Sequence, residues 1–117
     1  MGRHDDDIRL KHMLDYAREA VSLSEGRTRA DLDCDRLYNL AMTRLIEVIG
    51  ESAARLSEAT RNAHPTIPWA QIIAARNRLI HGYDQINNDI LWDIIDLDLR
   101  PLIIELEQIA DADDDTA

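Results

Sequence analysis

Apolar residues in the first half of the chain recur at steps of three and four, which is the period of an amphipathic helix. Residues 5–25 form the first predicted helix, with Asp5, Asp6 and Asp7 suited to its positive N-terminal end and Gly26 to its C-cap. The inward-facing positions of this helix are Ile8, Met13, Leu14, Ala17, Ala20, Val21 and Ser24.

Residues 26–33 are expected to be a polar connection, and residues 35–62 a long second helix. The predicted inward stripe of that helix is Leu37, Leu40, Ala41, Leu45, Val48, Ile49, Ser52, Ala53 and Leu56. Gly50 inside it costs about 1 kcal/mol relative to alanine, and the close approach of another helix would compensate that cost. Glu51 is either an ordinary surface acid or an inward partner for an arginine.

Prolines divide the second half of the chain. Pro65 and Pro68 forbid a continuous helix, and Pro68 fits the first turn of a third helix over residues 68–81 that Gly82 ends. Asn87 to Asp89 offer N-cap chemistry for a fourth helical segment that runs to about residue 110, with a kink or restart at Pro101. The pattern predicts one domain over residues 1–117, an all-α antiparallel bundle of four to five helices.

Composition supports helices over a sheet, because aromatic residues make up only 4% of a chain that is 45% hydrophobic. The single cysteine, Cys34, excludes an intrachain disulfide and a multi-cysteine metal site, and is expected to be a small buried or half-buried thiol. The chain has neither an apolar run of membrane-spanning length nor a signal peptide at its start, so we expect a cytoplasmic protein with no membrane partner.

The formal net charge of −10 argues against a nucleic-acid partner, but the acids are unevenly distributed. Seven of them lie in the two ends, residues 1–7 and 111–117, which we expect to be frayed. No acid occurs between Glu58 and Asp84, where the basic residues are Arg61, His64, Arg76, Arg78 and His81. This window is either a local basic surface or a chance gap in a short chain.

Residues 76–83 (Arg-Asn-Arg-Leu-Ile-His-Gly-Tyr, the octet below) concentrate chemistry that suits cleavage of a phosphodiester without a metal or cofactor. His81 is able to transfer protons near neutral pH, and Arg76 to clamp phosphate oxygens and transition-state charge. Asn77 could orient either group. On one ideal helix Arg76 and His81 are separated by about 140°, so a single chain does not bring them together. The alternative is a surface arginine with a C-cap histidine.

The wider pattern resembles the HepT-like branch of the HEPN superfamily. The resemblance rests on Ile49-Gly50-Glu51-Ser52-Ala53, Ile67-Pro68-Trp69, the spacing of Arg76, Asn77, His81 and Tyr83, and Trp92, in that order. Ser52 stands where alanine is more usual. The resemblance implies an α-bundle that dimerises through the motif-bearing helices, with the two octets facing each other.

The resemblance also implies a function. The chain would be a metal-independent ribonuclease toxin of a toxin–antitoxin pair, with Arg76, Asn77 and His81 catalytic and with Arg78 and Arg61 as possible RNA contacts. An MntA-like nucleotidyltransferase antitoxin would inhibit it by transferring AMP to Tyr83, next to the catalytic histidine. The alternative hypothesis is a non-catalytic helical module that binds and regulates the nucleotidyltransferase, which the acidic balance favours.

Overall fold

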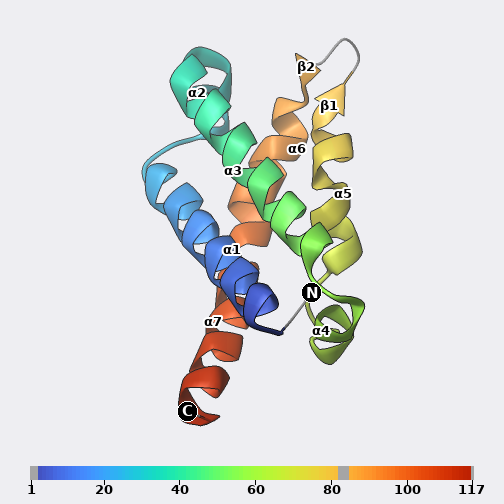
Figure 1. The fold of residues 1–117 in the computed structure, drawn as a ribbon. Coiled ribbons are helices and arrows are strands. Elements are labelled where there is room, and N and C mark those ends of the chain that lie inside the picture. The colour runs from blue at the N-terminus through green and yellow to red at the C-terminus, as the bar shows by residue number, and fades with distance from the viewer. Residues whose placement is uncertain (1–2, 82–84, 117) are drawn as a thin grey trace.

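The structure, a computed structural model, describes residues 3–81 and 85–116. Helix α3 lies at the centre, with α1 packed against one side, α5 against the other, and α7 against α1 (Figure 1). The prediction of an all-α bundle is confirmed, with one addition, a two-stranded antiparallel ladder. In chain order the elements are α1 (Arg3–Leu23), α2 (Arg29–Cys34), α3 (Arg36–Arg55), α4 (Glu58–Ala63), α5 (Trp69–Leu79), β1 (Ile80–His81), β2 (Gln85–Ile86), α6 (Asn88–Asp93), the π-helix η1 (Ile94–Asp98) and α7 (Leu99–Thr116).

The connection after α1 is partly helical, so the prediction of a polar loop over residues 26–33 is wrong. Gly26 adopts φ +74°, as its predicted role at the end of the first helix requires. The backbone N–H of Thr28 then donates to the Asp31 carboxylate at 2.7 Å and starts α2. Helix α2 buries Leu32 but leaves Cys34 exposed, so the expectation of a buried or half-buried thiol is also wrong.

The inward face of α3 agrees with the prediction in its second half, where Ile49 and Ala53 are buried, and differs from it in the first two turns. Leu37 is 80% exposed and Leu40 48% exposed, while Tyr38 is buried. Tyr38 is fixed there by a 2.7 Å hydrogen bond between its hydroxyl and that of Ser24 and by the Arg27 guanidinium over its ring. The buried positions of α3 are Tyr38, Met42, Thr43, Ile46, Ile49, Gly50 and Ala53.

The predicted helix over residues 35–62 is interrupted at Leu56 and Ser57, where Ser57 caps α4 by accepting the N–H of Thr60. Asp6 in α1 holds this break in place. Its carboxylate accepts the Ser57 N–H at 3.2 Å and the Ser57 and Thr60 hydroxyls at 2.6 Å each. Asp6 is only 2% exposed, so the N-terminal acids are not uniformly frayed as expected, and at the other end α7 continues to Thr116.

Gly50 marks the crossing of α3 and α5, as its position in a predicted helix suggested. A Cβ atom added to Gly50 would lie 2.9 Å from the carbonyl oxygen of Ile72. Since real Cβ atoms are not found so close to a backbone oxygen, only glycine permits this approach of the two helices. The prediction of a close helix approach at Gly50 is confirmed.

Helix α5 ends at Leu79, two residues before the predicted end, and the chain then enters β1. Strands β1 and β2 pair Ile80 with Ile86 and His81 with Gln85. Gly82, the predicted stop residue, lies outside the described residues. Asn87 caps α6 as predicted, since its side chain accepts the N–H groups of Asp89 and Ile90.

The helix does not restart at Pro101. Instead a π-helix precedes it, with the Leu99 N–H donating to the Ile94 carbonyl. Proline lacks the N–H that would pair with the carbonyl four residues earlier, and a wider turn accommodates its ring. The predicted restart at Pro101 is wrong, because α7 begins at Leu99 and runs through the proline, and the alternative of a kink stays a prediction.

Candidate functional site

The last turn of α5 presents three polar side chains to solvent. Arg76, Asn77 and Arg78 are all exposed, while Ala75 and Leu79 anchor the turn in the core. Within residues 3–81 and 85–116, none of the three polar side chains forms a hydrogen bond or an ion pair with a protein group. Two guanidinium groups and an amide are therefore available to bind phosphate oxygens.

The backbone of His81 lies two residues beyond this turn, in strand β1. It is extended and paired with Gln85, so His81 does not sit on the helix and the rotation expected on an ideal helix does not apply to it. The helix dipole acts on a group within the last turn, and its effect on His81 is weaker two residues beyond the end. Tyr83, the predicted acceptor of AMP, lies outside the described residues.

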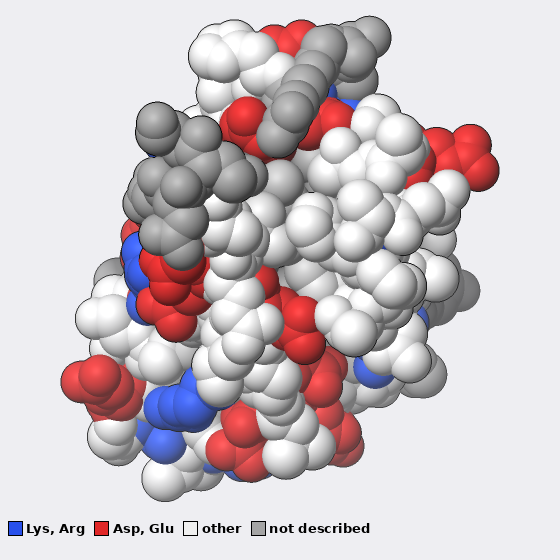
Figure 2. Space-filling view, turned by 90° about the horizontal axis from the view of Figure 1, so that it is seen from below, with Lys and Arg blue, Asp and Glu red and all other residues white. Residues whose placement is uncertain are grey.

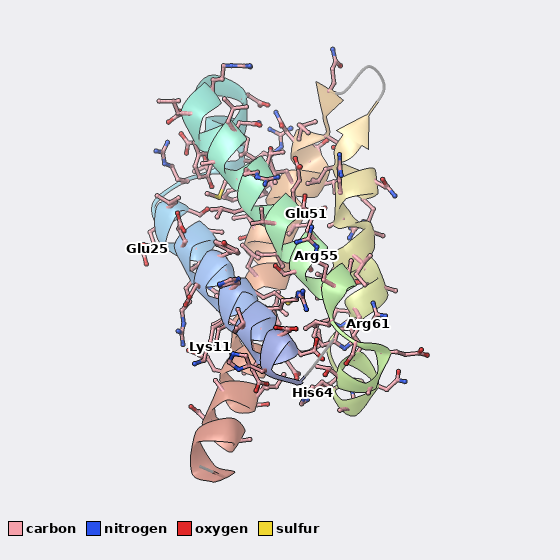
Figure 3. The ribbon with its side chains drawn as sticks, viewed as in Figure 1. Lys11, Glu25, Glu51, Arg55, Arg61 and His64 are labelled. Atoms are coloured by element: carbon pink, nitrogen blue, oxygen red, sulfur yellow. The ribbon has the colours of Figure 1, made fainter. Side chains whose placement is uncertain are left out.

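Glu51 lies on the outer face of α3, and its partner is an arginine of the same helix. Its Oε1 atom is 3.6 Å from Nη1 of Arg44, which also lies 3.8 Å from Glu47. Glu51 and Arg55 point outward from the front of α3 (Figure 3). The hypothesis of an inward arginine partner for Glu51 is therefore wrong, although the side chain is only 39% exposed.

Arg61 lies at the opposite end of α5 from Arg76 and Arg78. Its carbonyl oxygen accepts the Trp69 indole N–H at 3.0 Å, which places it beside the first residue of α5 (Figure 3). Seven residues of helix rise about 10 Å, so the fold does not bring Arg61 to the other predicted RNA contacts. One chain gathers Arg76, Asn77, Arg78 and the backbone of His81, and leaves Arg61 apart.

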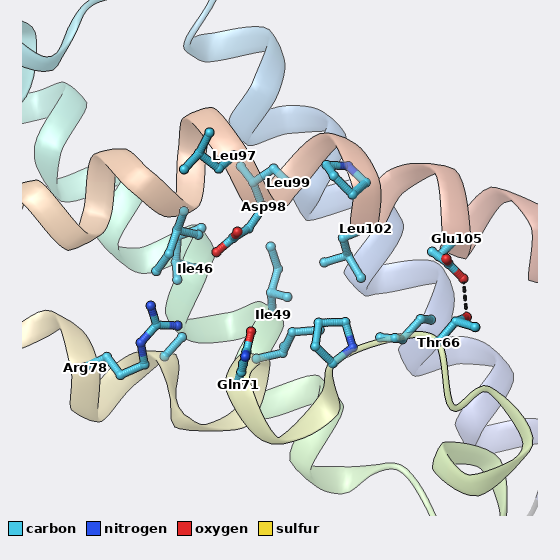
Figure 4. Close-up of a pocket in the computed structure, with 16 residues that line it drawn as sticks. Ile46, Ile49, Thr66, Gln71, Arg78, Leu97, Asp98, Leu99, Leu102 and Glu105 are labelled. Carbon is cyan, nitrogen blue, oxygen red and sulfur yellow. Dashed lines mark hydrogen bonds between the residues drawn. The ribbon is translucent and has the colours of Figure 1, made fainter.

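A pocket of about 180 Å³ opens between α5 and the segment from η1 to α7 (Figure 4). Its lining is mostly apolar and includes Ile46 and Ile49 of α3, and Arg78 stands at one side with Asp98 opposite. Burial raises the pKa of Asp98, the Arg78 guanidinium lowers it, and Asp93 raises it further. The sequence alone did not single out Asp98, because its position depends on the π-helix.

The described residues contain no group of three His, Cys, Asp or Glu side chains placed to hold a metal ion. None of the helices in that part of the chain combines the length and apolar character needed to cross a membrane. The face seen from below in Figure 2 carries acidic side chains among uncharged ones, and basic side chains occupy smaller separate areas of it. Among the described residues that this view shows, the basic side chains therefore form no continuous surface for RNA.

Comparison with known proteins assigns the sequence to a family. The family described as Ribonuclease HepT-like matches residues 13–109. A Thermococcus cleftensis protein named "Probable ribonuclease HepT" is 31% identical over 103 residues, covering 85% of this chain and 94% of that protein. A Methanocaldococcus jannaschii protein named "Putative RNase" is 32% identical over 105 residues, and the match covers 88% of this chain and 87% of that protein. No solved structure matches the chain significantly. The family match spans most of the chain, including the last turn of α5, β1 and the pocket, and the chain therefore belongs to the HepT-like ribonuclease family.

Proposed function

We propose that this protein is a metal-independent endoribonuclease that acts in the cytoplasm as the toxin of a toxin–antitoxin pair. The observation that carries the proposal is the turn at the end of α5. There Arg76, Asn77 and Arg78 are exposed, lack protein partners among the described residues, and are followed three residues later by His81 in a chain of the HepT-like ribonuclease family.

The chemistry uses the 2′-hydroxyl of RNA as an internal nucleophile. His81 removes the 2′-hydroxyl proton while the 2′-oxygen attacks the adjacent phosphorus, and the bond from phosphorus to the 5′-oxygen breaks. The leaving 5′-oxygen takes a proton from water, which gives a 2′,3′-cyclic phosphate and a 5′-hydroxyl end, and His81 returns the proton it accepted to the solvent. Arg76 stabilises the extra negative charge on the phosphoryl oxygens, and Asn77 positions the phosphate or the imidazole.

The proposed active form is a homodimer in which the octets of two chains face each other, so that one site uses groups from both. An MntA-like nucleotidyltransferase is the proposed antitoxin, and Tyr83 the residue to which it transfers AMP. A phosphate-bearing group two residues from His81 would repel and block the phosphate of an RNA substrate.

The catalytic assignment is tested by cleavage of purified tRNA and mRNA in the presence of EDTA. His81→Ala is expected to lower the rate by about 10²–10⁴ and Arg76→Ala by about 10²–10³, and both should relieve growth arrest on induced expression. Arg100→Ala, at an exposed arginine of α7, is the matched control and should cleave like the parent.

Two outcomes would count against the proposal. If both variants remain as toxic and as active as the parent, the assignment of His81 and Arg76 is wrong. If the parent binds the nucleotidyltransferase tightly but cleaves no RNA, the non-catalytic binding module is the correct function.

The regulatory step is tested by intact mass after co-expression with the nucleotidyltransferase. The expected adduct is one or more AMP units on the parent chain and none on Tyr83→Phe. An unmodified parent, or an adduct that persists in Tyr83→Phe, would remove Tyr83 from this role.

A further inference from the structure

The pocket between α5 and η1–α7 combines a mostly apolar lining with a few polar side chains. Ile46 and Ile49 of α3, together with Leu102 of α7, line its interior, and the rings of Pro68 and Pro101 complete the apolar lining. Small-molecule sites share this combination of an apolar cavity with a few convergent polar side chains.

Three polar side chains point into the space over the apolar lining: Arg78 and Gln71 from α5 and Asp98 from η1 (Figure 4). Arg78 and Asp98 influence each other electrostatically, but no nitrogen–oxygen pair between them lies within the 4.0 Å of an ion pair. Neither side chain makes a hydrogen bond to another of the described residues. A donor and an acceptor thus face each other across an apolar slot, each without a protein partner there.

We propose that this pocket binds a guanine base of the RNA substrate, with Asp98 and Arg78 as specificity-determining residues. The inference rests on the proposed ribonuclease function and deepens it, because it names the base that the enzyme selects near the cleaved bond. Arg78 lies two residues from Arg76 in the last turn of α5, about 160° around the helix from it, so a bound RNA would pass around that turn between the base pocket and the phosphate held by Arg76.

Guanine is the RNA base whose edges match this arrangement. A carboxylate accepts hydrogen bonds only, and guanine offers it two adjacent donors, the N1–H and the 2-amino group. Its O6 and N7 atoms are acceptors for an arginine. Adenine and cytosine each place an acceptor beside their amino group, and uracil has one N–H between two acceptors, so none of them satisfies Asp98 with two donors.

The proposal is tested on the full chain by NMR with labelled isoleucine methyl groups. Ile46, Ile49, Ile72 and Ile94 line the pocket, while Ile8 and Ile109 do not and serve as internal references. GMP is expected to shift the pocket methyls and to bind at least about tenfold more tightly than AMP, since one bidentate base contact discriminates by that much or more.

Two matched variants locate the recognition. Asp98→Asn should reduce the affinity for GMP to that for AMP, whereas Asp96→Asn, two residues away in η1 and outside the pocket, should keep the preference. Asp98 is exposed and makes no hydrogen bond within the described residues, so its amide variant is expected to fold normally. Equal binding of GMP and AMP by the parent, or a preference that survives Asp98→Asn, would overturn the proposal.

A second measurement distinguishes RNA from a free guanine nucleotide as the ligand of the pocket. A short 2′-O-methyl oligonucleotide, which resists cleavage, should bind more tightly than GMP when it contains one guanine, and lose that gain when adenine replaces the guanine. Tighter binding of GMP than of the oligonucleotide would assign the pocket to a free nucleotide and refute an RNA subsite.

Mapping of cleavage sites keeps the two proposals apart. Cuts by the parent are expected beside guanines, and Asp98→Asn should spread them over other bases while cleavage still depends on His81. Cleavage that requires His81 but shows no base preference overturns the pocket assignment alone. Absence of any cleavage overturns the proposed function, and with it the RNA source of the base.

Discussion

At the scale of single residues, Asp6 determines the path of a distant part of the chain. Three donors from Ser57 and Thr60 converge on its carboxylate, and Arg9 lies 3.9 Å away. Hydrogen bonds from Ser57 and then Thr60 lower the pKa of Asp6 below its ordinary value of 3.8, against the opposing effect of burial. The charged form of Asp6 therefore stabilises the start of α4 against α1.

Replacement of Asp6 by alanine is expected to lower the free energy of unfolding by about 2–3 kcal/mol at pH 7, because buried donors lose a charged acceptor. A lowered folded-state pKa means that the stabilisation is complete above the unfolded value, near 3.8, and is lost as pH falls through the folded value. Urea unfolding of the parent and of Asp6→Ala from pH 7 to pH 2 measures how the difference in their free energies of unfolding depends on pH.

Asp5→Ala is the control, since Asp5 is exposed one position away. It should change stability by less than about 0.5 kcal/mol. A difference between the parent and Asp6→Ala that does not shrink with acidification would show that the carboxylate charge contributes nothing.

At the scale of elements, the crossing of α3 and α5 positions the candidate site. Gly50 allows the backbone of α5 at Ile72 to approach α3, and the exposed turn with Arg76 lies one helical turn further along. Any change in this crossing would move the arginines relative to the rest of the bundle.

Gly50→Ala is expected to destabilise the protein by up to about 2 kcal/mol. Overpacking against the rigid Ile72 carbonyl costs about 1–3 kcal/mol, and the gain in helix propensity of about 1 kcal/mol offsets part of that cost. Thermal and urea unfolding test this, with Ser52→Ala on the same helix as the control. A more stable Gly50→Ala would mean that α5 shifts without cost.

At the scale of the whole molecule, an acidic protein is proposed to bind an acidic polymer. The net charge is −10, and binding would rely on a few arginines beside an unfavourable overall field. The proposed homodimer would supply two copies of Arg76 to the phosphates and two copies of Arg78 to the bases, with Arg76 of one chain and His81 of the other serving one site.

The few phosphate contacts should appear in the salt dependence of RNA binding. Two neutralised phosphates, one for each copy of Arg76, predict a slope of about −1.4 for the logarithm of the association constant against that of salt concentration. Fluorescence anisotropy with single-stranded RNA and the His81→Ala variant measures the slope, and adding Arg76→Gln to that variant should make it shallower. A slope steeper than about −6 would require a basic surface other than this turn.

Complementation between two inactive variants tests whether a site spans both chains. Co-expressed Arg76→Ala and His81→Ala chains form heterodimers with one intact site if Arg76 and His81 come from different chains, and with none if both come from one. Random pairing then restores about a quarter of the parent activity. Each variant expressed alone is the control, and the absence of any recovery would contradict the composite site.

The sequence by itself determined the features that depend on local physics. The helical repeat predicted the all-α bundle, Asn87 predicted the start of α6, and Gly50 predicted a close crossing. Each of these follows from a period, a cap or a missing side chain within a few residues, so no distant partner was needed to find it. The functional groups of the octet were also identified from the sequence, although the roles of its residues stay predictions.

The tertiary structure decided which face of each helix turns inward and which residues meet. Tyr38 rather than Leu37 enters the core because Ser24 hydrogen-bonds its hydroxyl and the Arg27 guanidinium lies over its ring. The helix breaks at Ser57 because the carboxylate of Asp6, 51 residues earlier, accepts hydrogen bonds from Ser57. Arg78 and Asp98 face one another only because α5 and the π-helix lie on two sides of one pocket. Contacts between residues far apart in the chain carry no signature in the local pattern of either partner, so only the packed chain reveals them.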